Sequence, residues 1–317
     1  MTLPSTYQPR TQTPFVYHDS LARMRVHSAG LMTTVQDLGR PGHTHLGVSP
    51  SGAADPVALR IGNRLVGNIE SAAALELTLI GGRYEFPQDA VVALTGAEFD
   101  ATIPMWTTVH VKAGETVDIR GARTGARGYL CVRGGVESGR RVLGSESTHL
   151  LSGFGRVVKK LDELVIGSTQ GVERIVTDKI TPPQYRKRLR VTAGAQAAEF
   201  DAAQALTLLS ETYRVTDDSN RMGLKLAGPA LQTPHGGQML SEGVALGAIQ
   251  VPPGGEPIIL FVDAQTTGGY PVIASVISAD LSSVGQLRPR DEITFDAVGL
   301  NEARRLLIEQ EEWIGST

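Results

Sequence analysis

One stretch of this sequence places polar and small residues between two aliphatic runs. The segment IILFVDAQTTGGYPVIASVI covers residues 258–277. Its centre combines an acid, an amide, two hydroxyls, two glycines and a phenol, supplied by Asp263, Gln265, Thr266, Thr267, Gly268, Gly269 and Tyr270. Such groups can hold a small ligand, because glycine lets a backbone amide approach it without an intervening Cβ. The same composition is typical of a tight turn, and the pattern alone favours neither.

A second polar stretch, DDSNRMGLKLAGP at 217–229, places Asn220 and Arg221 just before a glycine-punctuated strand pattern. Arginine offers a planar fork to a carboxylate or phosphate, and asparagine offers both a donor and an acceptor. Both residues are therefore candidates for ligand binding. Taken alone, an arginine in such a position is more often one member of a surface ion pair.

A third stretch, TTVQDLGRPGHTHLGVSPSGAADP at 33–56, predicts a loop of about 20 residues, a length that is usually functional inside a domain. It carries Gln36, Asp37, Ser49 and Ser51, and we add Gly52 as a candidate ligand-binding position. Asp55 precedes Pro56 and is predicted to cap a helix. A helix N-terminus can also bind an anion, so capping and a site role remain equally open for Asp55.

Common catalytic signatures are absent from the sequence. It contains no G-x-S-x-G elbow and no Gly-Lys dipeptide, which excludes a Walker-type phosphate loop. No cysteine pair or H-E-x-x-H motif offers a zinc site, and the alternating pair at 43–45 is interpreted as structural or exposed. Simple serine hydrolase, P-loop ATPase and zinc-enzyme functions are therefore not expected.

Length and composition limit the classes of protein to which this chain can belong. The 317 residues predict two domains of roughly 150 residues each. The 36 glycines and 17 prolines imply many turns and few long helices, which favours a β-rich fold. A net charge of −3 gives no basic footprint for nucleic acid or an anionic membrane, and no apolar segment is long enough to span a bilayer or to act as a signal peptide. The single cysteine, Cys131, is interpreted as a core residue, and we expect a cytoplasmic protein.

The strands expected to position these residues are recognised by apolar and polar side chains that alternate along short segments of the sequence. The segment at 74–86 places Leu75, Leu77 and Leu79 on one face and Glu76 and Thr78 on the other, the pattern of a half-buried strand. Residues 90–96 and 128–135 have the pattern of more fully buried strands. A basic residue, an acidic turn and an alternating strand recur at 112–121, 159–167 and 288–296, which is weak support for two related β domains.

Two helices are expected. The first begins after Asp55 and ends at Gly67, with apolar residues at helical spacing, and the second is amphipathic and begins at Asn301. Residues 168–188 lack periodicity and contain two prolines, so the domain boundary is placed there. We predict a flexible leader at 1–24, a first subdomain at 25–180 and a second subdomain with the C-terminal helix at 181–317.

Several longer motifs run in collinear order from about residue 25 to 297: GLMTTVQDLGRPG, GVSPSGAADPVALRIGNRLVGN, ALELTL, ALTGAEF, GSESTHLLSGFGR, SNRMGLKLAGP, SEGVALGAIQVPPGGEPIILFVDAQTTGGYP and ADLSSVGQLRPRD. With them the chain resembles the biotin-dependent carboxyltransferase family called allophanate hydrolase subunit 2. That family includes the C-type subunits of 5-oxoprolinases, an antagonist of a sporulation-kinase inhibitor, and one half of the carboxyltransferase domain of urea carboxylase.

The resemblance implies a mainly β fold with a few helices, built as two cyclophilin-like β-barrel subdomains. It also implies a partner of the same general fold, a subunit 1 or B-type protein, in a heterodimer or heterotetramer. In the family's 5-oxoprolinases, the B-type and C-type subunits act with a transient third protein, the A-type subunit, to open 5-oxoproline to glutamate at the expense of ATP. We therefore expect a hydrolase subunit that is inactive alone, with ATP and Mg²⁺ bound by the complex.

Opening a lactam requires donors for the developing oxyanion and cations or amides for a phosphate. We expect Thr266, Thr267 and the amides of Gly268 and Gly269 to serve the oxyanion, Arg221 to serve the phosphate, and Asp263 or Glu76 to place Mg²⁺ or accept a proton. The predicted catalytic set is Asp263, Gln265, Thr266, Thr267 and Arg221. The predicted substrate-binding set is Gly268, Gly269, Tyr270, Asn220, Gly52, Asp55 and Glu76.

Two alternatives stay open. In the first, the chain is half of a biotin-dependent carboxyltransferase acting on urea or a related amide, and the same pocket holds biotin. In the second, it is a non-catalytic antagonist that sequesters a subunit 1-like kinase inhibitor.

Overall fold

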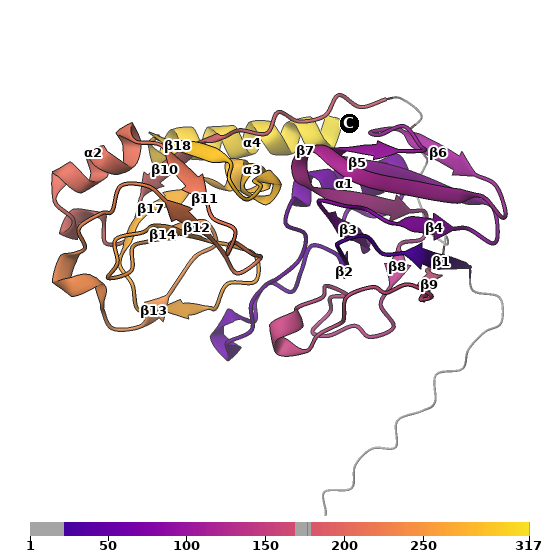
Figure 1. The fold of residues 1–317 in the computed structure, drawn as a ribbon, viewed down its shortest axis with the longest axis horizontal. Coiled ribbons are helices and arrows are strands. Elements are labelled where there is room, and N and C mark those ends of the chain that lie inside the picture. Colours follow the sequence, from indigo (N-terminus) through magenta and orange to yellow (C-terminus); the bar gives the residue numbers. More distant parts are fainter. Residues whose placement is uncertain (1–21, 169–175, 177–178, 317) are drawn as a thin grey trace, which may run out of the picture.

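The computed structural model describes residues 22–168, 176 and 179–316, and its strands form two sheets that lie side by side (Figure 1). All pairings in the first sheet are antiparallel, in the order β2-β3-β7-β4-β1-β9-β8, with β5 joining β7 to β6. Its strands are β1 (Arg23–Ser28), β2 (Met32–Gln36), β3 (Ala74–Thr78), β4 (Arg83–Glu85), β5 (Ala90–Ala101), β6 (Thr108–Val111), β7 (Thr116–Val132), β8 (Val136–Glu137) and β9 (Glu163–Ile166).

The second sheet closes into a barrel in the order β10-β17-β14-β15-β12-β11-β18, in which β18 closes onto β10 in parallel. Its strands are β10 (Arg188–Ala193), β11 (Tyr213–Val215), β12 (Gly223–Ala227), β14 (Ala248–Gln250), β15 (Ile258–Leu260), β17 (Val272–Val276) and β18 (Glu292–Ala297). A short ribbon of β13 (Glu242–Gly243) and β16 (Thr267–Gly268) lies outside it. The expectation of a mainly β protein with two barrel-like sheets is confirmed.

Within the described residues four α-helices accompany the sheets: α1 (Pro56–Leu65), α2 (Ala202–Ser210), α3 (Leu281–Gln286) and α4 (Leu300–Ser316). Short 3₁₀ turns are η1 (Thr44–Leu46), η2 (Leu150–Ser152), η3 (Ala197–Glu199), η4 (Pro234–Gly237) and η5 (Ser278–Asp280). Helices α1 and α4 occur where the sequence predicts them. The sequence did not reveal α2 and α3, which are only nine and six residues long.

Apolar side chains cover both faces of the first sheet, as the buried pattern of 128–135 predicts. On β7, Leu130 and Val132 point into the core enclosed by the sheet, whereas Tyr129 and Cys131 point toward α1. A Cβ on Gly62 of α1 would lie 2.6 Å from the Cys131 Sγ, so only glycine allows the helix to approach this closely. Cys131 is buried and its thiol pKa is raised by burial, which confirms it as a core residue.

The prediction for 74–86 is wrong at two positions, Glu76 and Leu79. Leu75 and Leu77 are buried as expected, but Glu76, assigned to the more exposed face, is also buried at 1% exposure. Leu79 has left the strand, with a positive φ of 57°. Period-2 alternation identifies the two faces of a strand but not what covers the second face. Here the 51–55 segment and the barrel cover it, as Glu76's contacts show.

The recurring basic-acidic pattern corresponds to one turn used three times, in both sheets. In each copy the acid accepts the backbone N–H of the basic residue three positions earlier: Glu115 from Lys112 (2.7 Å), Asp162 from Lys159 (2.7 Å) and Asp291 from Arg288 (2.8 Å). The residue before each acid has positive φ: Gly114 (83°), Leu161 (72°) and Arg290 (73°). The side-chain hydrogen bond holds the turn, which then leads into β7, β9 or β18.

Helix α4 runs along one side of the molecule past both sheets (Figure 1). Its Glu311 accepts two hydrogen bonds of 2.7 Å from Arg60 of α1, while its Gln310 donates to the Ala279 carbonyl of η5 at 3.0 Å. Ile314 is fully buried beside α1. The C-terminal helix therefore packs against both halves of the molecule. The first half contains the first sheet and α1, and the second half contains the barrel.

The leader predicted at 1–24 lies mostly outside the described residues, and Arg23 and Met24 already belong to β1. The first sheet ends at Ile166 and the barrel begins at Arg188, and part of the segment between them is also outside the described residues. The subdomain boundary near residue 180 stays a prediction. No helix in the described ranges is long and apolar enough to cross a membrane.

Candidate functional site

The two halves meet along a polar seam, formed by residues 49–55 of the first half and by residues 220–222 and 262–264 of the barrel. The backbone of Val262 accepts hydrogen bonds from the Ser51 amide (3.0 Å) and the Ser49 hydroxyl (2.9 Å). The Asp263 amide donates to the Arg221 carbonyl at 2.9 Å, which fixes these two residues relative to each other. Parts of all three polar stretches that the sequence singles out separately thus lie together.

Arg221 is the centre of this seam. Its Nε donates to Asp263 Oδ2 (2.7 Å), one terminal nitrogen donates to Glu76 Oε1 (2.6 Å), and the other donates to the Gly52 carbonyl (2.6 Å). Burial alone would lower the pKa of Arg221, but the carboxylates of Glu76 and Asp263 raise it above its ordinary value. The guanidinium is therefore charged and fully engaged.

The carboxylate oxygens of the seam have partners as well. Glu76 Oε2 accepts from the Tyr129 hydroxyl (2.7 Å) and the Ala54 amide (2.8 Å), and Asp263 Oδ1 accepts from the Ser51 hydroxyl (2.7 Å). Burying such charges is tolerable only when they are paired and hydrogen bonded in this way. The cluster can fix the two halves against each other.

Asp55 extends the network toward α3. Its Oδ1 accepts from the Ala58 amide (3.0 Å), which is the predicted helix cap, and its Oδ2 accepts from Gln286 Nε2 (2.7 Å). Burial raises the pKa of Asp55 above its ordinary value of 3.8. A Cβ on Gly285 would lie 2.1 Å from the Ala54 carbonyl, so glycine allows α3 to reach the start of α1. The anion-binding role that the sequence leaves open is not favoured here, because the Asp55 carboxylate itself caps the start of α1 and accepts from Gln286.

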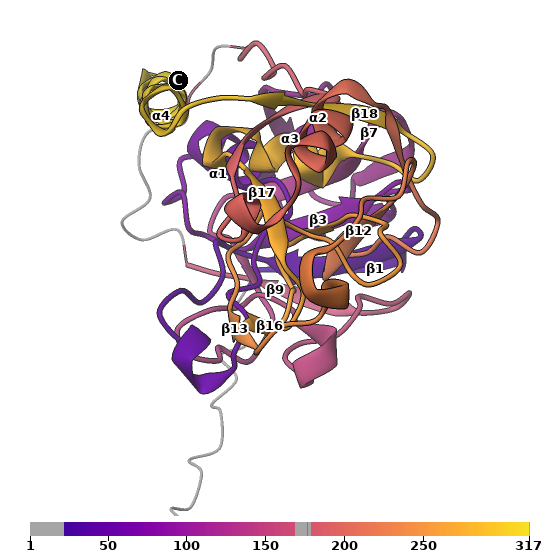
Figure 2. The ribbon, with the colours of Figure 1, turned by 90° about the vertical axis from the view of Figure 1, so that its left-hand side faces the viewer.

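The remaining predicted residues form a separate feature, the rim loop, residues 265–270. Gln265, Thr267 and Tyr270 are exposed, and Thr267 and Gly268 pair with β13. This ribbon projects toward the same end of the molecule as η1 and η2, away from α4 (Figures 1 and 2). The structure therefore places Asp263 in the seam and residues 265–270 at the rim.

Of the two rim glycines, Gly268 has a packing reason for its identity, whereas a Cβ on Gly269 would lie 3.2 Å from its nearest neighbour, the Met239 carbonyl. A Cβ on Gly268 would lie 2.4 Å from Gln250 Nε2, which itself donates to the Tyr270 carbonyl at 3.2 Å. Gly269 has its carbonyl bonded by the Met239 amide at 2.9 Å. The close approach that Gly268 permits is thus made by the Gln250 side chain, while Thr266 is partly exposed and Thr267 is exposed.

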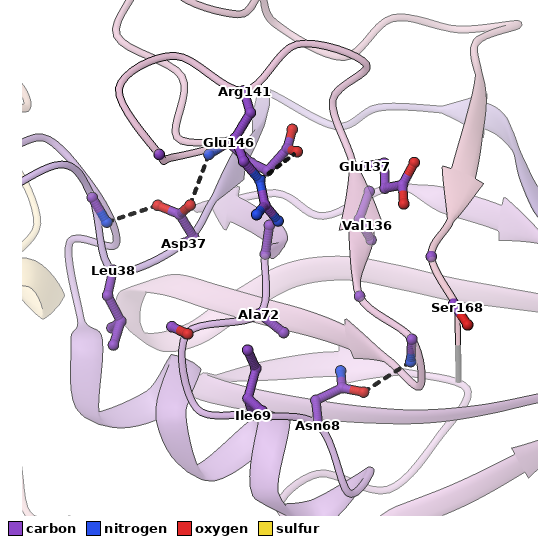
Figure 3. A pocket seen from close by; sticks show the side chains of 17 residues that line it. Asp37, Leu38, Asn68, Ile69, Ala72, Val136, Glu137, Arg141, Glu146 and Ser168 are labelled. Atoms are coloured by element: carbon purple, nitrogen blue, oxygen red, sulfur yellow. Dashed lines mark hydrogen bonds and ion pairs between the residues drawn. The ribbon is translucent and has the colours of Figure 1, made fainter. Parts of the chain in front are cut away.

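A different pocket, of about 320 Å³, lies beyond the seam in the first half (Figure 3). Asp37 borders it, and its carboxylate accepts hydrogen bonds from Gly39, Ser145, Glu146 and Ser147. Asn68 accepts from the Gly134 amide at 2.8 Å on the opposite wall. Asp37 therefore supports the 144–147 turn, which is an internal role for a residue of the predicted functional loop.

The comparisons with known proteins agree on one family. Residues 46–297 match the family model described as carboxyltransferase domain, subdomain A and B. The chain belongs to this family. It is 38% identical over 306 residues to the 5-oxoprolinase C subunit of Escherichia coli K12, covering 92% of this chain and 96% of that protein. It is 36% identical to the Haemophilus influenzae protein of the same name, over 86% of this chain and 90% of that protein.

Among solved structures, the carboxyltransferase fold of this chain matches the K. lactis urea amidolyase with a TM-score of 0.83 and 29% identity. The match covers 94% of this chain but only 20% of that much longer protein. The match therefore establishes the fold along nearly the whole chain. Most of the longer protein has no counterpart in this chain, and its activity involves those residues as well.

Three further residues of this carboxyltransferase domain contact the seam network without being predicted from the sequence: Arg127, Tyr129 and Gln286. Tyr129 and Arg127 sit within β7, where an alternating strand pattern marks them only as strand residues. Gln286 lies in the motif ADLSSVGQLRPRD that contributed to the resemblance, which was the one signal available. Its side chain accepts from the amides of Ala126 and Arg127 at 3.0 Å each.

Proposed function

We propose that this chain is the C-type subunit of an ATP-dependent 5-oxoprolinase, which opens 5-oxoproline to glutamate and acts in complex with a B-type partner and a transient A-type protein. The observation that carries this proposal is the similarity to the E. coli protein over 96% of that protein's length. A cytoplasmic location, where ATP is available, is part of the proposal.

In this function the seam holds the rim loop in position, and the rim loop supplies the groups that contact the substrate. The donors and acceptors around Arg221 are already used, so they hold the Asp263 end of the 263–270 stretch in place. Thr266, Thr267, Gln265 and Tyr270 carry hydrogen-bonding groups at the open end. Hydroxyl donors fixed near a lactam oxygen would stabilise the oxyanion that forms when the ring is attacked. Because the rim loop is exposed, the partner chain would supply the opposite wall and exclude water.

The residues of the seam do not fit a magnesium ion. Glu76 and Asp263 each give Arg221 an oxygen, and their other oxygens accept from Tyr129, Ala54 and Ser51, so a cation would have to displace the arginine. Among the described residues, no group of three or more His, Cys, Asp or Glu side chains is arranged to hold a metal. We propose that ATP and Mg²⁺ bind outside the seam, with ligands from the partner proteins.

The direct test is reconstitution. The purified B-type and A-type proteins, ATP and Mg²⁺ are combined with 5-oxoproline, with and without this chain, and glutamate is measured. The proposal predicts glutamate only when this chain is present. Glutamate formation that does not depend on this chain, or no glutamate from the complete set, contradicts it.

A second candidate is one half of a biotin-dependent carboxyltransferase acting on urea. The match to the urea amidolyase structure favours it. Under this alternative the same preparation would transfer a carboxyl group from carboxybiotin to urea and would leave 5-oxoproline untouched. Running both substrates in parallel separates the two functions.

A further inference from the structure

We propose that a small cavity at the seam, lined by Arg127, binds a small oxyanion. The cavity measures about 100 Å³ and is formed by both halves. Residues that line it include Thr78, Arg127, Ser219, Asn220, Phe261 and Val284. It is separate from the rim loop and from the pocket of Figure 3. None of the proposed 5-oxoprolinase chemistry is needed for this inference, since binding can be measured on this chain alone.

Arg127 is the second arginine of the seam, and its pairing is much weaker than that of Arg221. Its side chain is 15% exposed, and its closest ion-pair distance to Glu76 is 3.7 Å, against 2.6 Å for Arg221. The 3.7 Å contact is made by the buried Nε of Arg127; it is too long for a hydrogen bond, and no described residue accepts one from this atom. A buried guanidinium N–H without a hydrogen bond is costly, so this arginine is suited to an acceptor that comes from outside the chain.

The fold prevents Arg127 from finding that acceptor internally. Gln286 of α3 accepts from the Arg127 amide (3.0 Å) and donates to the Arg127 carbonyl (2.9 Å), which fixes the backbone from both sides. The two nearby carboxylates, Glu76 and Asp263, are already bound by Arg221. Burial lowers the pKa of Arg127, as expected for a cation whose charge is incompletely compensated.

The other polar groups of the cavity favour an anion. The Oδ1 of Asn220 accepts from the Met222 amide at 2.8 Å, so the group that Asn220 can offer to a ligand is its amide NH₂, a donor. Asn220 is exposed and lies at the mouth. The volume is several times the roughly 10–15 Å³ that one water needs on this measure. A planar guanidinium next to an amide donor suits a carboxylate, bicarbonate or phosphate.

The test is direct titration of the purified full chain with sodium phosphate, bicarbonate, acetate and 5-oxoproline, each by calorimetry at fixed ionic strength. We expect at least one of the four to bind with a dissociation constant of about 1 mM or below. The pattern among them distinguishes a phosphate source from a carboxylate source. Failure of all four to bind the wild-type chain overturns the proposal.

Two variants test the location. Arg127→Met keeps the length of the side chain and should weaken binding at least about tenfold, the expected loss of a charge-assisted contact. Arg123→Met, which removes an exposed arginine from the same strand, is the matched control and should bind as the wild type does. Equal binding by Arg127→Met overturns the proposal.

A melting curve separates a ligand site from a structural role. Because Arg127 has an unpartnered buried nitrogen, Arg127→Met should melt no lower than the wild type in the absence of ligand. A lower melting temperature would assign the residue to stability instead. Asn220→Asp provides an independent variant, since it keeps the acceptor for Met222 and places a negative charge at the mouth. It should also weaken binding about tenfold, and unchanged binding counts against the site.

Discussion

The seam around Arg221 and the rim loop at 265–270 adjoin in sequence but differ in how far their polar groups are already satisfied. Asp263 is buried, and both of its oxygens accept hydrogen bonds. A few residues later, Gln265 and Thr267 are exposed. The difference shows that polar residues clustered in sequence need not share a function: one end of the stretch holds the halves together, and the other is available to a ligand.

The largest expected effect is on the seam. Arg221→Met should lower the free energy of unfolding by about 3–5 kcal/mol, because it leaves Glu76 and Asp263 buried without their counter-charge. Urea denaturation measures this loss in the free energy of unfolding. Arg290→Met is the control, because the ion pair of Arg290 with Asp217 is exposed to solvent and should contribute little to stability. Equal effects of the two substitutions would show that the seam does not hold the halves together.

A smaller loss is expected for Tyr129→Phe. The Tyr129 hydroxyl donates to Glu76 at 2.7 Å and accepts from the Asp55 amide at 2.8 Å, so its removal leaves the buried Asp55 amide without this acceptor and takes one of the two hydrogen bonds from Glu76 Oε2. The expected cost is about 1–3 kcal/mol in the same denaturation experiment. A variant as stable as the wild type would mean that the hydroxyl is not part of a closed network.

The pH dependence of stability tests Asp55. Because the pKa of Asp55 is raised in the folded state, the folded protein holds this proton more tightly than the unfolded chain does. Its contribution to stability is therefore largest below pH 3.8 and declines as the pH rises through the raised pKa. Asp55→Asn still offers an oxygen to cap α1, and its stability should lack this decline. Parallel pH profiles for the two proteins would contradict the assignment.

Local signals account for the parts of the molecule that the sequence predicted. Helix α1 follows from Pro56, the Asp55 cap and Gly67, all within one short segment. The buried strands follow from alternation, and the family resemblance supplied the two-sheet plan. These features depend on neighbours along the chain, which a single sequence displays.

The seam could not be predicted in the same way. Glu76 and Arg221 are 145 residues apart, and their pairing depends on how the barrel docks on the first half. For the same reason Arg221 and Asp263 were interpreted as groups for phosphate and metal, although the fold pairs them with each other. Arg127 lies in no quoted motif and Gln286 only in the family motif at 279–291, and neither location reveals a role that arises at the contact between β7 and α3.

The smallest effect on stability, and the most direct test of the account, comes from the rim. Replacing Thr266 and Thr267 by valine in the reconstituted 5-oxoprolinase should leave the unfolding free energy within about 0.5 kcal/mol of the wild type, since Thr267 is exposed. Glutamate release should fall by about a hundredfold through loss of oxyanion donors. Thr212→Val, at another exposed threonine, should release glutamate as the wild type does. Full activity in the rim variant, with folding and partner binding intact, would contradict the account.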